Sequence, residues 1–433
     1  MQIQPKSFAF TLLLGFLAAV PYSGIDINLP ALAATGASLD SSASDVGLTM
    51  SAFMVSLAAA PLLYGPVSDR FGRKPVLMFG VALFIVASLT CANAQSLPEL
   101  LIFRFVQGIG AASTALTFAV IRDLFDETTA RAKIANVMVA INVVTILAPT
   151  AGAALLTLGS WRLIYAVQTA IGIALLWAVL LGFGESARID SRIEPRIDAR
   201  TDPVNRLGPA AVIRSYLRVL THRVSFSYIL VGAACSATLF AYVTGSSLFF
   251  IDVVGLTASK YGLIFSACSA AVMSGALLDG RLGRRGVQPA QVMAIGLAMS
   301  AAAASTLLAM VLSGWVPPAL VAALLMAVAF TFGMTIPNIL NATMQPLPDI
   351  AGAVSAAAGS IQMIAGAVSS SLVAVLFDGR SALSMAAVMA ASSLLALTAY
   401  WLLARPAERD DNSAGRLGTQ SASGVTRSVT HPN

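Results

Sequence analysis

The sequence predicts an all-α membrane protein in which twelve transmembrane helices form two pseudo-symmetric six-helix bundles. Composition is the first observation: of 433 residues, 57% are hydrophobic and only 11% are charged, and the mean hydropathy is +0.82. The apolar residues also gather in long uncharged stretches, as membrane-spanning helices require. A charged loop near the start recurs in the second half of the chain, which indicates two related halves.

The uncharged stretches are long enough to cross a membrane, because a spanning helix needs roughly 20 mostly apolar residues at a rise of about 1.5 Å each. Eleven stretches qualify, at residues 7–25, 46–68, 75–98, 105–121, 134–161, 163–184, 224–251, 261–278, 286–348, 350–377 and 381–404. The ninth is too long for one crossing, and the helix-breaking run Ser-Gly-Trp-Val-Pro-Pro at 313–318 divides it into two. Twelve helices are therefore expected.

The first stretch has an alternative interpretation as a cleaved signal peptide, since Lys6 precedes an apolar run that ends in small residues near Ala34. The run is long for a signal sequence and contains Asp26, and its removal would leave eleven helices. We therefore take it as the first span.

Lysine and arginine fall mainly on one side of the membrane when successive loops are assigned to alternate sides. Of the 26 basic residues, only Arg162, Lys260 and Arg380 fall in loops of the other side, and Arg104 lies within a span. The positive-inside rule makes the basic side, with both termini, cytoplasmic. This topology explains the net charge of +6, so no nucleic-acid partner is implied.

These assignments divide the chain into an N-terminal bundle (1–184), a cytoplasmic linker (185–224), a C-terminal bundle (225–404) and a tail (405–433). The linker contains prolines and charges of both signs, and a surface helix is expected in it around residues 210–220. The tail is rich in Ser, Asp, Arg and Gly and is expected to be disordered.

The loop between the second and third spans carries the pattern Gly-x-x-x-Asp-Arg-x-Gly-Arg-Lys, and a second copy with one inserted glycine follows the eighth span. Its aspartate can face a helix N-terminus or an arginine, its basic residues can bind anionic lipid and carboxylates, and its glycines permit close approach and a tight turn. The pattern favours an inside gate over the alternative, a set of basic residues that only fixes topology. The expected gate residues are Gly65, Asp69, Arg70, Gly72, Arg73 and Lys74, with Gly275, Asp279, Arg281 and Gly283 in the second copy.

Two ionisable residues lie inside predicted spans, where burial is costly and a functional role is the default interpretation. Asp26 should lie about 12 Å, and Arg104 about 9 Å, below the outer ends of their helices. The matched depths favour a buried pair or a water-filled cavity, with Tyr22 beside Asp26, and Gln107 and Gly108 beside Arg104. The alternative is that both residues are interfacial, at helix ends placed a few residues off.

The chain shows no pattern typical of a metal or cofactor site, and none is expected. The three cysteines are scattered in or at the edge of spans, and the two histidines lie in the linker and the tail. A membrane enzyme is disfavoured, because the spans hold no cluster of His, Cys and Glu. A channel or membrane scaffold is also disfavoured, because neither requires the repeated loop or a carboxylate matched with an arginine.

Several motifs resemble those of the major facilitator superfamily, and the resemblance covers residues 7–404. The loop at 65–74 matches the signature loop of that superfamily, and residues 104–112 match its fourth-helix motif Arg-x-x-Gln-Gly-x-Gly-Ala-Ala. The fifth-helix antiporter motif is degenerate, since only Pro149 and Gly152 keep its pattern. Residues 26–32 and 122–125 resemble the drug:proton antiporters of the bicyclomycin and chloramphenicol resistance (Bcr/CflA) type.

This resemblance implies a proton-coupled secondary transporter that exports small, lipophilic drugs across a bacterial inner membrane by alternating access. A metabolite exporter or importer of the same fold is the alternative, and the degenerate motif leaves antiport and symport open. Asp26 is the expected proton carrier, with Arg104 beside it. Phe332 and Asn338, in a Met-rich part of the second half, are expected to line the cargo cavity. The expected partners are a small-molecule substrate, protons and membrane lipid, and the chain is expected to act as a monomer.

Overall fold

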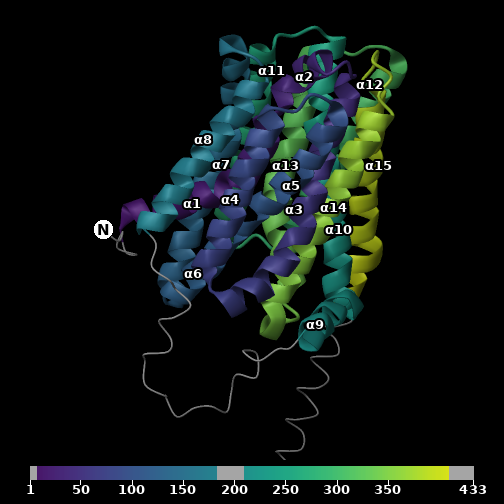
Figure 1. Cartoon of the computed structure of the whole chain (residues 1–433). Coiled ribbons are helices and arrows are strands. Elements are labelled where there is room, and N and C mark those ends of the chain that lie inside the picture. Colours follow the sequence, from purple (N-terminus) through teal and green to yellow (C-terminus); the bar gives the residue numbers. More distant parts are fainter. Residues whose placement is uncertain (1–6, 183–208, 409–433) are drawn as a thin grey trace, which may run out of the picture.

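The structure is a computed structural model that describes residues 7–182 and 209–408. Within these ranges, twelve helical segments are long and apolar enough to cross a membrane, which confirms the predicted number. They lie side by side in one elongated body (Figure 1). Residues 1–6, 183–208 and 409–433, which hold most of the predicted linker and of the predicted tail, lie outside the described residues.

The first half of the chain contains six spans, several of which begin at a serine cap. Ser7, Ser42 and Ser96 each accept a hydrogen bond from a backbone N–H in the first turn of a helix, as N-caps do. Pro30 lies where the first span breaks into a 3-10 turn, because proline has no N–H to continue the helical ladder. The elements are α1 (Phe8–Asp26), η1 (Leu29–Ala31), α2 (Leu32–Ser38), α3 (Ala43–Phe71), α4 (Arg73–Ala92), α5 (Leu97–Ala112), η2 (Ser113–Ala115), α6 (Leu116–Leu124), α7 (Glu127–Leu158) and α8 (Arg162–Gly182).

The second half contains six further spans and the surface helix α9 (Pro209–Thr221), where a helix was predicted around residues 210–220. The predicted break at 313–318 is confirmed, since Gly314 has a φ of 75° and the next helix begins at Pro318. The remaining elements are α10 (Arg223–Ser247), η5 (Leu248–Val253), α11 (Ala258–Arg284), α12 (Pro289–Ser313), α13 (Pro318–Met344), η6 (Pro348–Ile350), α14 (Ala351–Val375), α15 (Leu383–Ala399) and η7 (Tyr400–Ala404).

The predicted boundary between the last helix and a disordered tail at residue 405 is wrong by one helical turn. The helix continues through Arg405 to Glu408. The phenol of Tyr228, at the start of α10, donates a 2.7 Å hydrogen bond to the Glu408 carboxylate. A buried hydroxyl without a hydrogen-bond partner is costly, so this bond stabilises the last turn of the helix, which carries Glu408.

The two halves meet along two seams, α3 against α14 and α7 against α11. We call the end of the molecule that carries α9 the linker end and the opposite end, near α2, the distal end (Figure 1). Hydrogen bonds join the halves in the middle, from Ser360 to the Ala58 carbonyl, and toward the distal end, from Ser247 to the Leu29 carbonyl. The distal end is therefore closed between the bundles.

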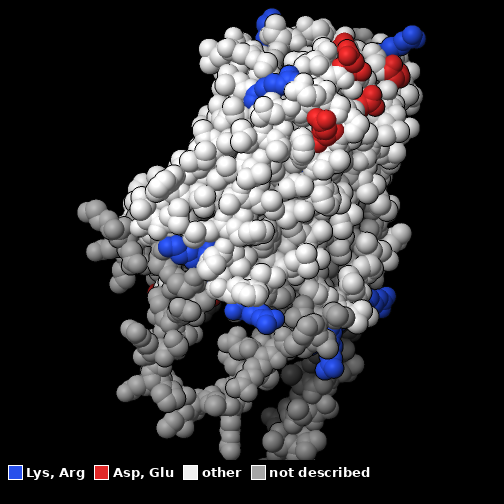
Figure 2. Space-filling view, in the orientation of Figure 1, with Lys and Arg blue, Asp and Glu red and all other residues white. Residues whose placement is uncertain are grey.

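Charged side chains are separated from the apolar surface in the way that a membrane protein requires. On the face that Figure 2 shows, lysine, arginine, aspartate and glutamate lie toward the two ends, and a broad uncharged band lies between them. The membrane-spanning helices also carry exposed large apolar side chains, among them Phe79, Ile102 and Trp177. Lipid tails can cover such side chains, whereas water would not favour their exposure.

Candidate transport site and gates

Arg104 is the centre of a polar network inside the first bundle. It lies on α5 and its side chain is 0% exposed. One guanidinium nitrogen, Nη1, donates to the Gly24 carbonyl of α1 at 3.1 Å and to Oε1 of Gln107, one turn along α5, at 2.7 Å. The predicted polar face of this helix is therefore present, and Arg104 is enclosed by protein.

Gln107 extends the network to two more helices. Its amide Nε2 donates to the Ser88 hydroxyl of α4 at 2.8 Å and to Oε1 of Gln168 on α8 at 2.7 Å. Ser88, Gln107 and Gln168 are all buried. The sequence reasoning missed Gln168 and Ser88, although a lone amide within an uncharged stretch is the same kind of signal that revealed Arg104.

The Arg104 guanidinium has no acidic partner among the described residues. Its Nε and Nη2 atoms make no hydrogen bond there, although both are buried. Its compensation comes from aromatic rings, with the Phe53 centroid at 4.4 Å and the Tyr165 centroid at 5.9 Å. A desolvated cation over an aromatic face is stabilised by about 2 kcal/mol or more. Because arginine stays charged in proteins, the bundle holds a fixed positive charge here.

Asp26 does not pair with Arg104, so of the two predicted arrangements, a buried pair or a water-filled cavity, the pair is absent from this structure. The Asp26 side chain is 7% exposed and, among the described residues, makes no hydrogen bond or ion pair. The reason is geometric. Arg104 contacts Gly24, and two residues along a helix correspond to about 200°, which points Asp26 to the other side of α1.

The Asp26 carboxyl instead faces the second bundle. It acts electrostatically on the hydroxyls of Tyr22, one turn away on α1, and of Tyr242 and Tyr261 on α10 and α11. The Tyr22 side chain is 40% exposed. The predicted placement of Tyr22 beside Asp26 is thus reproduced.

Aromatic rings form the wall of the second bundle opposite Asp26. Tyr242 stacks on Phe265 with centroids 5.5 Å apart and planes 16° apart, and Phe265 also contacts Tyr261 at 6.1 Å. The Tyr261 hydroxyl lies 3.1 Å from that of Ser246. A carboxyl facing phenols and stacked rings can bind a proton or an organic cation. No pattern in the sequence marks these tyrosines as functional, because buried aromatic residues are common in any helix bundle.

Of the other residues predicted for the cargo cavity, two occupy different places. Phe332 on α13 packs inside the second bundle, beside a small internal cavity that it lines with Thr238 and Ser393. Asn338 donates a 2.7 Å hydrogen bond to the Asp279 carboxylate, so it belongs to the second gate loop. Gly108 lies on α5 against α3, where a methyl group would approach the Phe53 carbonyl oxygen to 2.4 Å.

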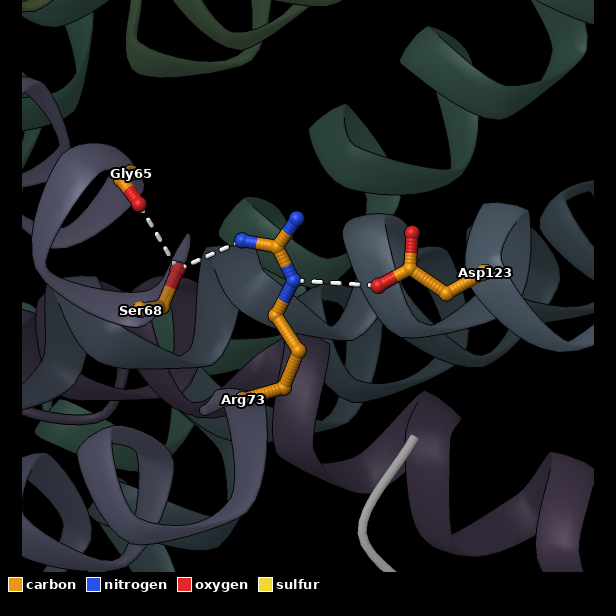
Figure 3. A network of polar contacts seen from close by, with 4 residues as sticks. All are labelled: Gly65, Ser68, Arg73 and Asp123. Atoms are coloured by element: carbon orange, nitrogen blue, oxygen red, sulfur yellow. Dashed lines mark hydrogen bonds and ion pairs between the residues drawn. The ribbon is translucent and has the colours of Figure 1, made fainter. Parts of the chain in front are cut away.

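The first gate loop is held within its own bundle (Figure 3). Arg73 donates through Nε to the Asp123 carboxylate at 3.0 Å and through Nη1 to the Ser68 hydroxyl at 2.5 Å, and Ser68 donates to the Gly65 carbonyl at 2.8 Å. Asp123 ends α6, so the loop clamps α3 and α4 to α6. Gly72 has a φ of 98°, which confirms the predicted tight turn.

The other residues of the two gate loops are partly described. Lys74 donates to the Leu180 carbonyl near the end of α8 at 3.3 Å. Arg70 and Arg281 are exposed, and Gly283 has open space beside it. The side chain of Asp69 lies outside what the structure describes, so its predicted contact with an arginine or a helix N-terminus stays a prediction.

Gly65 and Gly275, which the repeat aligns, have different surroundings. A methyl group on Gly275 would lie 2.0 Å from the Phe330 carbonyl oxygen, so close approach is present there. Nothing lies within 4 Å of such a group on Gly65. Yet Gly65 is on the same side of α3 as Met54 and Ala58, which contact α14. The α3 and α14 helices therefore diverge toward the linker end.

At the distal end, hydroxyl groups and small residues join α7 to α11. The Thr150 hydroxyl lies 2.7 Å from that of Ser266, and Ser266 donates to the Ile146 carbonyl at 2.6 Å. Pro149 is buried in this seam, and a methyl group on Gly262 would lie 3.2 Å from its carbonyl oxygen. Gly152 instead packs on α1, where a methyl group would lie 2.0 Å from the Ile27 carbonyl oxygen.

The fold and these two seams around a membrane-embedded carboxyl define a multi-pass membrane transporter. The sequence profile of the Major Facilitator Superfamily matches residues 11–370. The chain belongs to the major facilitator superfamily. Among the described residues, no group of three or more His, Cys, Asp and Glu side chains is placed to hold a metal ion.

Relatives in sequence include a protein named as a transporter and two named for drug resistance. The chain is 28% identical over 403 residues to the uncharacterized MFS-type transporter YdgK of Bacillus subtilis, covering 92% of this chain and 96% of the relative. It is 26% identical over 408 residues to the bicyclomycin resistance protein homolog of Haemophilus influenzae, covering 93% and 98%. The multidrug resistance protein MdtL of Escherichia coli is 29% identical over 255 residues, or 58% of this chain and 61% of that protein.

Solved structures share the fold at low sequence identity. A bacterial homologue of the human lysosomal transporter Spinster, in an inward-facing and occupied conformation, superposes with a TM-score of 0.71 at 16% identity, covering 93% of this chain and 97% of that one. The xylose transporter XylE of E. coli, in a partially occluded inward-open conformation, gives a TM-score of 0.66 at 16% identity, covering 92% and 98%.

Proposed function

We propose that this protein exports small, lipophilic drugs across the inner membrane of a bacterium in exchange for protons, by alternating access of one central site. Similarity to a bicyclomycin resistance protein homolog along nearly the whole chain, and to MdtL over part of it, supports a drug as cargo. In this proposal the linker end and both termini are cytoplasmic, as the distribution of lysine and arginine supports. The chain acts as a monomer.

The observation that carries the proposal is the position of Asp26. The carboxyl is buried, makes no hydrogen bond or ion pair among the described residues, and lies within electrostatic range of Tyr22 and of Tyr242 and Tyr261 in the second bundle. An ionised carboxylate in such a place is costly unless something compensates its charge. A proton or a cationic cargo group is the compensation that the site allows, and only one of them fits on the carboxyl at a time.

In this proposal Arg104 influences Asp26 from the other side of α1, without touching its side chain. The fixed charge of Arg104 lies on the other side of the helix and contacts the backbone one half-turn before Asp26. Movement of α1 or α5 during transport changes the distance between this charge and the carboxyl, and with it the affinity of Asp26 for a proton. Arg104 is thus a positioning residue, whereas Asp26 binds the proton.

Alternating access then requires the two ends to close in turn. The closed distal seam and the open space beside Gly65 support a state whose central site faces the linker end. In the opposite state, α3 approaches α14 at Gly65 and the hydroxyl contacts between α7 and α11 separate. The charged gate loops lie where the first of these movements occurs.

The test is transport by the purified full chain in liposomes with an imposed proton gradient, using a panel of lipophilic cations, neutral antibiotics, amino acids and sugars. We expect gradient-driven accumulation of lipophilic drugs and no amino-acid or sugar transport. Asp26→Asn should abolish gradient-driven accumulation while counterflow exchange of cargo survives, since the amide keeps the volume but does not ionise and reprotonate. Asp252→Asn, at an exposed aspartate of the distal end, is the matched control.

Two results would contradict the proposal. Accumulation by Asp26→Asn that still collapses with the proton gradient would place the proton carrier elsewhere. Transport of amino acids or sugars in preference to drugs would make the protein a metabolite transporter of the same fold.

A further inference from the structure

An apolar groove runs along the outer surface of the first bundle at its linker end. It has a volume of about 480 Å³ and is lined by Ala60, Leu63, Tyr64, Val67, Phe71, Pro75, Val76, Phe79 and Ile109. The walls are α3 and α4, and Ile109 of α5 contributes to the floor. This volume lies within the range of about 300–1,000 Å³ of ligand sites in proteins.

The groove opens to the membrane rather than to the space between the bundles. Its residues on α3 lie on the opposite side of that helix from Met54 and Ala58, which contact α14. Leu63, Phe71 and Phe79 at its edges are 64–70% exposed. An occupant of the groove would therefore not compete for the site around Asp26.

The side chains that line the groove are apolar, so they favour a hydrocarbon chain as the occupant. The one hydroxyl among the lining residues, on Tyr64, already donates to the Ile109 carbonyl at 3.0 Å. A polar ligand would thus find no free side-chain partner on these walls. The length also fits, because the twelve residues from Ala60 to Phe71 span about 16 Å, close to half of a hydrocarbon core that is about 30 Å thick. The groove matches an acyl chain of one leaflet.

Positive charge lies at the mouth of the groove. The exposed guanidinium of Arg70 lies 5.5 Å from the centroid of Phe71, a lining residue, and makes no ion pair among the described residues. The N-terminus of the 20-residue helix α4 begins beside it at Gly72, without a side-chain cap. Helix N-termini and arginine both favour phosphate oxygens.

We propose that this groove is a binding site for an anionic glycerophospholipid from the leaflet at the linker end. One acyl chain lies between α3 and α4, and the headgroup phosphate contacts Arg70 at the start of the gate loop. The neutral walls and the basic mouth together distinguish this occupant from a lipophilic drug, which needs only the walls, and from soluble phosphate, which needs only the mouth. The site is independent of whether the protein exports drugs.

The experiment is native mass spectrometry of the purified full chain after equilibration with phosphatidylglycerol and phosphatidylcholine of identical acyl chains. We expect one retained lipid with a preference for phosphatidylglycerol. Arg70→Gln should lower that preference about fivefold, the factor for one basic residue near an anionic surface, which corresponds to roughly 1 kcal/mol. Val67→Trp fills the groove at a position that is 41% exposed and should lower retention of both lipids alike. Arg285→Gln, an exposed arginine at the linker end of the other bundle, is the matched control and should change nothing.

Four outcomes would overturn the site. They are an unchanged preference in Arg70→Gln, an equal loss in Arg285→Gln, displacement of the lipid by inorganic phosphate alone, and a retained mass that equals a second copy of the chain. Displacement of both lipids by a lipophilic drug in the wild type but not in Val67→Trp would assign the groove to drug instead. Because mass spectrometry reads binding directly, a failure here leaves the transport assay of the proposed function unaffected.

Discussion

Arg104 donates a hydrogen bond to the carbonyl oxygen of Gly24 and makes none with Asp26, two residues further along the same helix. The two membrane-embedded charges of the first bundle are therefore at similar depth but on opposite sides of α1. The positive one is enclosed by Phe53, Tyr165 and Gln107, and the acidic one faces the second bundle. Any coupling between them must act across α1 and not through a direct side-chain contact.

This geometry predicts additive effects of Arg104 and Asp26 on stability. Arg104→Gln and Asp26→Asn share no side-chain contact, so the double variant should equal the sum of the single effects within about 0.5 kcal/mol. Arg104→Gln combined with Gln107→Leu, whose side chains are hydrogen-bonded, should show a coupling of roughly 0.5–3 kcal/mol. Thermal unfolding in detergent measures both cycles. A coupling above about 1 kcal/mol between Arg104 and Asp26 would mean that the side chains touch.

The two aligned glycines of the gate loops should respond oppositely to alanine. Gly65→Ala lies in a helix with open space, so it should raise stability by about 0.5–1 kcal/mol. Gly275→Ala meets the Phe330 carbonyl oxygen and should lower stability by roughly 1–3 kcal/mol. Transport by Gly65→Ala should nonetheless be slower, because the added methyl group hinders the approach of α3 to α14. Full transport activity of Gly65→Ala in liposomes would show that this approach is not needed.

The ion pair of Arg73 with Asp123 should contribute little and should depend on salt. The two side chains are 16% and 32% exposed, which places them between buried and surface pairs. Asp123→Asn should cost about 1 kcal/mol or less at low ionic strength, and the difference should shrink as salt is added. Thermal unfolding of both proteins across a salt series measures this. A difference that is unaffected by salt would indicate that the hydrogen bond, not the charge, holds the loop.

The distal seam should open more readily without its hydroxyl contacts. Ser266→Ala removes the donor to Ile146 and the partner of Thr150, a loss of about 0.5–1.5 kcal/mol per net hydrogen bond. The population open at the distal end should rise about 2- to 12-fold for one such bond. Spin-label distances between the distal ends of α7 and α11 measure this population. Ser274→Ala on the same helix is the control, because its hydroxyl donates only within α11, to the Ala270 carbonyl.

The turn between α14 and α15 should lose stability in acid. Backbone N–H groups of Arg380 and Ser381 donate to the Asp378 carboxylate at 2.9 Å and lower the pKa of Asp378. A carboxyl whose pKa is lowered by folding stabilises the fold above its unfolded value of about 3.9, and this contribution is lost as pH falls through the lower folded pKa. Asp378→Asn should therefore melt below wild type near neutral pH and match it in strong acid. Because the carboxyl is exposed, the difference should be small.

The sequence predicted the helices and the charges but not what surrounds the charges. Twelve spans, the break near Pro318 and the burial of Asp26 and Arg104 all follow from where charge and proline interrupt apolar stretches. Which side of α1 faces which partner depends on rotation of the helix, and a depth estimate along the axis contains no such information. The sequence therefore could not decide between a buried pair and a water-filled cavity, although it identified both residues.

Asn338 and Gly65 illustrate the same limit at the gates. Asn338 lies beside a proline and among methionines, a context that is compatible with a cavity, yet its partner Asp279 is distant in sequence. Gly65 and Gly275 match in the repeat, but their surroundings differ. Helix α13 packs directly against Gly275, whereas α14 diverges from α3 and leaves open space beside Gly65. A repeated motif predicts a repeated turn and leaves the conformational state of each copy undetermined.

The hydrogen bond of Tyr228 with Glu408 also decides where the polypeptide can be shortened or joined to another protein. A cut after Ala404, the end of the apolar sequence, would remove the acceptor and leave a phenol that is 0% exposed without its partner, at a cost of roughly 1–3 kcal/mol. A fluorescent reporter or affinity tag should therefore be attached after Glu408, so that residues 405–408 are kept. Proteins trimmed at these two sites should differ in yield, although they differ by only one turn of helix.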